Sequence, residues 1–295
     1  MGFENSGGIF PIHRGVRFLL LSASPGSATR EVRCRLGERD PAVLEEADGG
    51  LDAGAARDRG VTLTPALLRR MSGPGLAIPY LTGRPELQLV ERLVAAYPGL
   101  ADGRGWGARF GRELNRSDDT PLFSRRRTGM PVVEGKHIDP FGVRLRDCEL
   151  RVANPDGLPG PALREAVRRH RLAYRDVASA TNRLTLIAAI VPPGAVTVHT
   201  LYCLREAMPI DDQTVLCCML NSFTNFLARL WVTTHLGTAT VERLPVPRPP
   251  AASWAAGRLR ELGRELLESG GRNPAAYAEA QGLAALLYGL TPAEI

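Results

Sequence analysis

Residues 216–247 constrain the fold more than any other stretch of the sequence. Between residues 216 and 231, apolar side chains recur every three or four positions, which predicts a helix with one buried face. The opposite face of that helix is polar, and its row of residues spaced four apart consists of Asn221, Asn225 and Arg229. A hydroxyl-rich loop with a histidine follows at residues 233–240. Residues 241–246 then predict a short edge strand, because the prolines in and after it cannot donate to a neighbouring strand.

The composition indicates a globular protein. The chain has 295 residues, of which 44% are hydrophobic and 23% are charged. It contains no apolar run of about eighteen residues, the length that a membrane-spanning helix needs, and its N-terminus lacks the pattern of a signal peptide. Five cysteines without a CxxC pair predict neither a disulfide framework nor a zinc site. We therefore expect a cytoplasmic protein in a reducing compartment.

The positive charge is concentrated in one region. The whole chain has a net charge of +6, and residues 121–183 alone contain thirteen Lys and Arg against seven Asp and Glu, which is again a net of +6. A clustered basic excess is typical of a surface that binds a polyanion such as DNA. A genome-wide preference for arginine is an alternative explanation, since Lys136 is the only lysine in the chain. Charge alone favours nucleic-acid binding without excluding that alternative.

The hydrophobic pattern predicts a mixture of helices and strands. Near the N-terminus, residues 18–21 and 32–36 are typical of two strands joined as a hairpin by a Ser-Pro-Gly-Ser turn. Further strands are predicted at residues 61–64, 130–138, 141–145, 171–178, 184–191 and 196–204. Helices are predicted at residues 64–71, 85–97, 162–171, 254–267 and 273–288. A proline at the first helical position or a glycine just past the end marks several of these boundaries.

One short segment suggests catalysis. Glu134 and Lys136, with Asp118 or Asp119 upstream, resemble the acidic pair and the lysine with which metal-dependent nucleases hold Mg²⁺ and activate water. A strand interrupted by a turn at Gly135 gives the same three residues, and we favour that interpretation because three-residue matches are common. A magnesium-dependent nuclease that uses Glu134 and Lys136 is kept as an alternative function.

Other polar residues suit recognition better than catalysis. None of the five histidines belongs to a metalloprotease or serine-hydrolase motif. Arginines such as Arg175 and Arg183 suit guanine edges and phosphates, and Asn182 suits adenine. A solvated pair of Arg175 with a neighbouring acid explains that residue equally well. The sequence has no P-loop lysine motif, and it has no NPPY or DPPY motif of the kind that holds a flipped adenine during methylation.

Taken together, these residues resemble a known family. Residues 2–21 (GFENSGGIFPIHRGVRFLLL) and 71–78 (MSGPGLAI) are similar to the end of the methyltransferase domain of type IIG-like restriction–modification adenine methyltransferases. Residues 110–119 (FGRELNRSDD) and 130–141 (MPVVEGKHIDPF) resemble the entry into their TaqI-type target-recognition domain. Three more segments resemble the central strands, the closing unit and the tail of that family, at residues 171–193, 216–247 and 283–295.

The resemblance implies an α+β fold in which the remnant of a Rossmann-like methyltransferase lobe is followed by a β-rich target-recognition domain and C-terminal helices. The implied parts are the tail of the methyltransferase-like lobe, a helical connector, the DNA target-recognition domain and the C-terminal helices, at residues 1–65, 66–118, 119–247 and 248–295. In the family, the cofactor-binding and NPPY segments lie upstream of these parts, so the catalytic residues map onto no position of this sequence. We expect no cofactor bound by this chain, with S-adenosylmethionine bound by the full-length enzyme.

The implied function is sequence-specific recognition of double-stranded DNA, as the specificity portion of an adenine-specific DNA methyltransferase in a restriction–modification system. This chain alone is not expected to be catalytic. From their chemistry rather than from the family, the residues expected to contact DNA are Lys136, His137, Arg144, Arg175, Asn182, Arg183, Arg229, Thr233, Thr234 and His235. A further alternative is a subunit that docks on a separately encoded methyltransferase lobe through its C-terminal helices.

Overall fold

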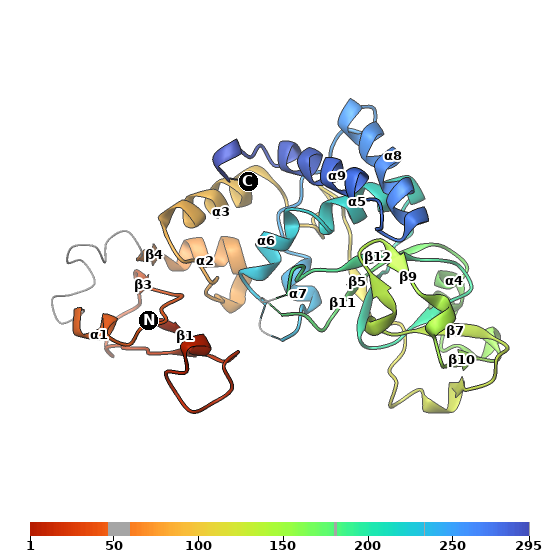
Figure 1. Ribbon diagram of the computed structural model, residues 1–295, viewed down its shortest axis with the longest axis horizontal. Coiled ribbons are helices and arrows are strands. Elements are labelled where there is room, and N and C mark those ends of the chain that lie inside the picture. Colours follow the sequence, from red (N-terminus) through yellow and green to blue (C-terminus); the bar gives the residue numbers. More distant parts are fainter. Residues whose placement is uncertain (47–59, 180–181, 233, 295) are drawn as a thin grey trace. The chain divides into compact units, whose positions relative to one another are not determined.

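The computed structural model describes residues 1–46, 60–179, 182–232 and 234–294 (Figure 1). The chain divides into two compact units, Met1–Ala96 and Tyr97–Ile295. Both units combine helices with small sheets, which confirms the predicted α+β class. The finer division at residues 65, 118 and 247 stays a prediction.

The first unit contains two small two-stranded sheets, three α-helices and two short 3-10 helices among its described residues. Its elements are β1 (Gly2–Glu4), η1 (Asn5–Gly7), β2 (Arg17–Leu19), β3 (Val32–Cys34), α1 (Val43–Glu46), β4 (Val61–Leu63), α2 (Pro65–Ser72), η4 (Gly73–Gly75) and α3 (Arg84–Ala96). The predicted helices at residues 64–71 and 85–97 are confirmed. The Thr64 hydroxyl accepts a hydrogen bond from Leu67 N at 3.1 Å, as expected of a residue that caps a helix.

The N-terminal strands pair differently from the prediction. β2 is antiparallel to β1 and β3 is antiparallel to β4, so the predicted hairpin of residues 18–21 with residues 32–36 is wrong. The buried side chain of Asn5 explains the difference. Its amide nitrogen donates to Phe10 O at 3.1 Å and Ile12 O at 3.0 Å, and its oxygen accepts from Phe10 N at 2.8 Å. These bonds close the loop between β1 and β2, and hydrophobic periodicity carries no sign of them.

The outer side of β2 is open in the described part of this unit. The side of β1 that faces away from β2 bonds to the chain at residues 35–38, through Gly2 N to Arg35 O at 2.7 Å. The sheet itself has two strands, so no described strand pairs with the far side of β2. Leu19, Leu20 and Leu21 expose 74%, 55% and 81% of their surface there. An open apolar edge of this kind is suited to pairing with another strand.

The second unit contains the β-rich region and the C-terminal helices. Its strands are β5 (Phe110–Gly111), β6 (Phe123–Ser124), β7 (Met130–Val133), β8 (Ile138–Asp139), β9 (Gly142–Val143), β10 (Arg151–Val152), β11 (Arg171–Arg175), β12 (Ala188–Val191), β13 (Val196–Thr197) and β14 (Leu201–Leu204). Its α-helices are α4 (Pro161–Ala166), α5 (Ile210–Leu220), α6 (Thr224–Arg229), α7 (Thr238–Val241), α8 (Trp254–Ser269) and α9 (Pro274–Leu287). Short 3-10 turns lie at η5 (Thr120–Leu122), η6 (Gly135–His137), η7 (Leu145–Asp147), η8 (Pro155–Gly157) and η9 (Pro292–Glu294).

Two four-stranded sheets form the centre of this unit. The first has the order β12-β11-β14-β5 and is antiparallel throughout. The second has the order β13-β7-β10-β6, and within it β13 is parallel to β7. Val133 of the second sheet and Ala173, Val191 and Leu201 of the first belong to one buried cluster. The two sheets therefore share a hydrophobic core, which fixes their strand ends relative to one another.

The long helix predicted at residues 216–231 is broken. It consists of α5 and α6, and the break lies at residues 221–223. The predicted polar face is also wrong for two of its three members, since Asn221 and Asn225 are buried. The Asn221 side chain accepts from Ala188 N at 3.0 Å and donates to Ala188 O at 2.8 Å, as a neighbouring strand would. A buried asparagine that bonds to a strand edge can stand at the same position in the helical repeat as an exposed one, so spacing alone does not distinguish the two.

The strand predicted at residues 241–246 is replaced by α7 and a loop. Gly237 precedes α7, whose first turn includes the bond from Val241 N to Gly237 O at 3.2 Å. Only Pro245 forms a β-bridge, with Gly99. The prolines had suggested an edge strand, but they serve equally well in the irregular segment that leaves a short helix.

The C-terminal helices were predicted well, and they pack on α5 (Figure 1). Ser253 and Asn273 cap them by accepting from the backbone nitrogens of Ala256 and Ala276. The turn between the helices rests against the β8–β9 hairpin, because a Cβ on Gly271 would lie 2.4 Å from Pro140 O. These helices therefore support a hairpin of the β-rich region.

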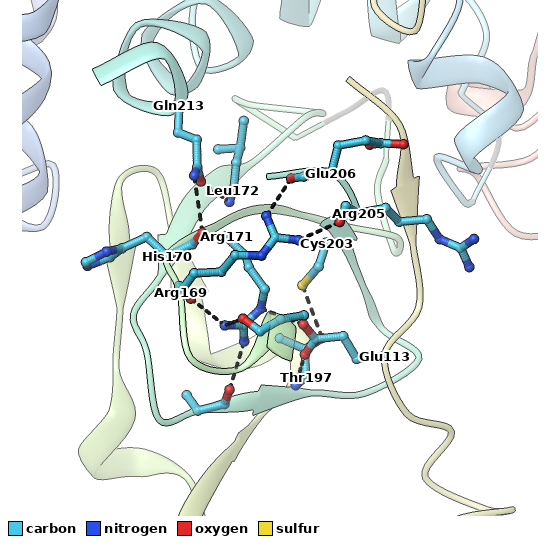
Figure 2. A network of polar contacts seen from close by, with 12 residues as sticks. Glu113, Arg169, His170, Arg171, Leu172, Thr197, Cys203, Arg205, Glu206 and Gln213 are labelled. Atoms are coloured by element: carbon cyan, nitrogen blue, oxygen red, sulfur yellow. Dashed lines mark hydrogen bonds and ion pairs between the residues drawn. The ribbon is translucent and has the colours of Figure 1, made fainter. Parts of the chain in front are cut away.

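A buried ion pair ties the β-rich region together (Figure 2). The guanidinium of Arg171 is fully buried and donates to Glu113 Oε1 at 2.6 Å and to Ala195 O at 2.8 Å. The other carboxylate oxygen of Glu113 accepts from the backbone nitrogen and the hydroxyl of Thr197, at 2.7 and 3.0 Å. The pair thus joins the start of β11 to β13 and to the chain that follows β5.

We expect Arg171→Met to destabilise the protein by about 3–5 kcal/mol, because it leaves the Glu113 carboxylate buried without its partner. The double variant Arg171→Met/Glu113→Gln removes both charges and should recover much of that loss. Urea unfolding followed by circular dichroism measures both effects. A loss below about 1 kcal/mol for Arg171→Met would contradict the role given to this pair.

Candidate nucleic-acid interface

Polar side chains collect where strands of both sheets end. β7 and β13 are parallel, so the segments that follow them leave at the same end of the second sheet. β5 and β11 both pair antiparallel with β14, so their carboxyl ends lie together at its start. Thr200 joins the two ends, since its hydroxyl accepts from Gly135 N at 2.8 Å and its carbonyl accepts from Asp176 N at 3.0 Å.

We call this region the polar edge. It consists of Arg112, Arg116, Glu134, Lys136, Asp139, Arg144, Arg175, Asp176, His199, Thr234 and His235. These residues come from five separate segments of the sequence, which the strand pairing brings to one side of the two sheets. Five of the ten residues expected to contact DNA lie here with their side chains at least partly exposed, namely Lys136, Arg144, Arg175, Thr234 and His235.

Asp139 is the acidic centre of one half of the polar edge. Arg144 forms an ion pair with it and also donates to Asp147 Oδ2 at 3.0 Å. Arg175 approaches the same carboxylate at 3.4 Å and donates to Ile138 O. Burial, and after it the charge of Arg144, lower the pKa of the Arg175 guanidinium. Two of the expected DNA contacts are therefore adjacent and share one counter-charge.

Glu134 forms ion pairs with two basic side chains in the other half of the polar edge. Its carboxylate forms ion pairs with Arg116 and, at 3.2 Å, with Lys136 Nζ. Burial tends to raise its pKa, but the hydrogen bond of Lys136 and the charge of Arg116 outweigh that effect and hold the pKa below its ordinary value. Glu134 is therefore an ionised partner of basic side chains.

This geometry gives the nuclease alternative no support. Both oxygens of Glu134 already contact cations, and Asp119 Oδ2 is engaged with the backbone nitrogen of Asn115 at 2.7 Å. Within the described ranges, no group of three or more Asp, Glu, His or Cys side chains could hold a metal ion. Mg²⁺ in proteins is usually held by one or two carboxylates with water filling the rest of its shell, and here both oxygens of Glu134 already face basic side chains.

His137 lies in the core and offers no side chain to a partner. It is 3% exposed, its Nδ1 accepts from Glu134 N at 3.0 Å, and that same atom lies 3.5 Å from Cys148 Sγ. The Nε2 atom is buried without a hydrogen-bond partner. The bond to Glu134 N closes a turn, so this histidine holds the Gly135–Lys136 segment in place. Its burial lowers the pKa of the imidazole.

The His235 loop is fastened to the end of β11. His235 Nδ1 lies 3.3 Å from one oxygen of the buried Asp176 carboxylate, and Arg112 lies 3.3 Å from the other. The backbone carbonyl of Thr234 accepts from Ala178 N at 3.1 Å. The side chains of Thr234 and His235 are exposed, whereas Thr233 lies outside the described residues.

Arg229 supports a neighbouring loop instead of facing outward. Its guanidinium donates to the backbone carbonyls of Asn182 and Arg183 at 3.0 and 3.2 Å and to the hydroxyl of Thr185 at 3.3 Å. Asn182 and Arg183 themselves are exposed. Arg229 is therefore placed to position this loop, and Asn182 and Arg183 are the members that face solvent.

Several residues of the polar edge escaped the sequence prediction. Arg112, Arg116 and His199 belong to it because Leu114 and Val198 form a parallel bridge, which no local pattern reveals. Asp139 is absent from the predicted set because a polyanion is expected to contact basic residues, and the sequence does not show which acids pair with them. The motif FGRELNRSDD contains both missed arginines, and its density of charge was the signal available.

Comparison with known proteins does not establish a family. No family model matches the sequence, and no curated protein matches it. One similar solved chain is that of MmeI, a type IIL restriction–modification enzyme in complex with DNA, with 10% identity and a TM-score of 0.40 over 62% of this chain and 33% of that chain. Another, from a type I restriction–modification system, has 12% identity and a TM-score of 0.33 over 69% of this chain and 50% of that chain. This chain spans a third to a half of the length of those two.

Two further expectations concern the setting of the protein. Within the described ranges, no helix is both long enough and apolar enough to span a bilayer. All five cysteines are free thiols in buried positions. Burial raises the pKa of Cys148 to about 11 and that of Cys218 to about 12, which keeps these thiols protonated at neutral pH.

We expect stability to fall as the pH is lowered below about 6.5, the ordinary histidine pKa, because the folded state holds His137 neutral while the unfolded state accepts a proton. This contribution is complete above that pH and is lost as the pH falls toward the lowered pKa of the folded state. His137→Gln keeps an acceptor for Glu134 N without a titrating group. Its urea midpoint should therefore change less between pH 7.5 and pH 5.5 than that of the wild type. The matched control is His170→Gln at an exposed site, and an equal change in both variants would contradict the assignment.

Proposed function

We propose that this chain recognises duplex DNA as the specificity portion of an adenine-specific DNA methyltransferase in a restriction–modification system. The observation that carries the proposal is the polar edge, where residues from five segments of the basic, β-rich region meet at one end of two packed sheets. The sequence resemblance to target-recognition domains concerns the same region.

The ion pairs of the polar edge are compatible with binding a polyanion. Arg144 and Asp139 are each nearly half exposed, and exposed ion pairs contribute only about 0–1 kcal/mol. A phosphate oxygen can therefore compete for the Arg144 guanidinium at little cost. In this arrangement Lys136, Arg144 and Arg175 would contact phosphates, which position the duplex, while Asn182, Thr234 and His235 would face base edges.

In this proposal the methylation reaction takes place on a methyltransferase lobe and not on this chain. The sequence contains no NPPY or DPPY motif, so no residue of this chain is given a catalytic role. S-adenosylmethionine would belong to the methyltransferase lobe of the full-length enzyme, and this chain would supply the choice of target sequence.

Salt dependence is the direct test. A fluorescein-labelled duplex titrated with the full chain should be bound roughly a hundredfold more weakly at 200 mM than at 50 mM salt if about four phosphates are contacted. Arg144→Gln should reduce the slope of log affinity against log salt by about 0.9, whereas Asn182→Ala should leave that slope unchanged. A folded wild-type protein that fails to bind, or binds with no salt dependence, would sink the proposal.

One observation favours a second role, docking on a separately encoded methyltransferase lobe. The open edge of β2 exposes three consecutive leucines, Leu19–Leu21, in the segment that resembles the end of a methyltransferase domain. Among the described residues, α8 and α9 expose two large apolar side chains, Trp254 and Leu286. The β2 edge is therefore a better candidate for that contact than the C-terminal helices.

Co-expression with a neighbouring protein that carries an NPPY motif tests this second role. We expect the two to co-purify, and Leu19→Glu/Leu21→Glu to abolish the association because charged side chains on an edge strand oppose strand pairing. Ile78→Glu, at another exposed apolar residue of the first unit, is the matched control. Association that survives the double change would rule out the β2 edge as the contact.

A further inference from the structure

The basic residues of the β-rich region differ in the acceptors that their side chains contact in the free protein. Lys136, Arg144, Arg171 and Arg175 are each paired with a carboxylate, as described above. Others donate to backbone carbonyls instead, namely Arg151, Arg164 and Arg169. These groups already have local acceptors in the free protein, which a phosphate would have to displace before it could bind them.

Three consecutive arginines have no such acceptor among the described residues, a property they share with the isolated, exposed Arg146 and Arg168. Arg125, Arg126 and Arg127 are exposed, and no carboxylate or hydrogen-bond acceptor contacts their side chains among the described residues. The surrounding sequence contains no acid between Asp119 and Glu134. The excess positive charge of the whole chain is +6, and these three guanidinium groups are free to express half of that amount at one place.

The loop that carries these arginines is anchored at both ends. It runs from the end of β6 to the start of β7, and both strands pair with β10 between them, at Arg151 and Val152. At its C-terminal end, Gly129 has a φ of +107°, and a Cβ there would lie 2.6 Å from Val152 O. The backbone of residue 129 therefore packs directly on β10, in a conformation that glycine adopts readily.

The anchoring strands rest on a hydrophobic core. Met130 and Val152 belong to a buried cluster that also contains Leu114 and Val198. Leu114 and Val198 in turn lead into the polar edge through Arg116 and His199. The arginine loop is thus mounted on the same sheet as the polar edge, and a ligand bound to the loop would be held by a packed support.

We infer that residues 125–127, which we call the arginine loop, are the principal phosphate-contacting element of this protein toward duplex DNA. The inference rests on the proposed function and deepens it. The polar edge would supply contacts that depend on sequence and geometry, and the arginine loop would supply most of the sequence-independent attraction. Arginine suits that task because its planar guanidinium can hold a phosphate through two hydrogen bonds.

The test compares two triple variants of the full chain that remove equal charge. Arg125→Gln/Arg126→Gln/Arg127→Gln changes the arginine loop. Arg69→Gln/Arg70→Gln/Arg84→Gln changes three exposed arginines of the first unit that make no ion pair with any residue the structure describes. Anisotropy titrations with a fluorescein-labelled duplex DNA at several salt concentrations give the affinity and the salt slope for each. Circular dichroism and urea midpoints confirm that the variants are folded.

The arginine-loop variant should bind at least about tenfold more weakly near 0.1 M salt, with a salt slope reduced by about 2–3. The matched control should lose much less affinity and keep its slope. Restoring charge with Arg125→Lys/Arg126→Lys/Arg127→Lys should recover most of the slope, which a purely structural loop would not do.

Two outcomes would overturn the inference while the proposed function stands. They are an unchanged slope in the arginine-loop variant and an equal loss in the matched control. Absence of DNA binding by the folded wild-type protein is a different result. It would overturn the proposed function itself, and the inference with it.

Discussion

The buried pair of Arg171 and Glu113 is the interaction on which the β-rich region depends. Two charges taken out of water cost several kcal/mol each, and they are tolerated only where every donor and acceptor finds a partner. Arg171 meets this condition with the carbonyls of Ala166, Arg169 and Ala195 in addition to Glu113. Its partners come from before β11, after β12 and after β5, so the pair fixes the order in which these segments meet. A hydrophobic residue at this position could fill the space but would offer none of these directional hydrogen bonds.

The fold was predictable wherever the cause was local. The helices that begin at Pro65, Trp254 and Pro274 carry their signals within a few residues, in the form of capping side chains and apolar spacing. The errors arise where a distant partner decides. Asn221 was assigned to solvent because nothing nearby in the sequence reveals that Ala188 will present an unpaired strand edge to it. Residues 18–21 were paired with the wrong strand because the loop is closed by Asn5 instead.

The candidate site was predictable in its chemistry and only partly in its membership. The excess of arginine marks the part of the chain that supplies much of the polar edge, and Arg144, Arg175 and His235 lie at one end of the sheets. Whether a given basic side chain is free depends on which acid the fold brings beside it, and that information is tertiary. His137 shows the limit most clearly, since a polar residue next to the only lysine is buried as the closing bond of a turn. The number of basic residues therefore overstates the charge that a ligand would meet.

The attachment of the His235 loop bears on how the exposed side chains of this loop could change over evolutionary time. Residues 234–236 are tied to residues 176–178 through the backbone bonds Ala178 N to Thr234 O and Leu236 N to Asp176 O. Hydrogen bonds between main-chain atoms do not involve the side chains of those residues. Substitutions at Thr234 can therefore accumulate while the frame of the loop persists, whereas a substitution at His235 would also remove its contact with the buried Asp176 carboxylate. Neutral drift at Thr234 would alter the exposed chemistry of the surface while the protein stays folded.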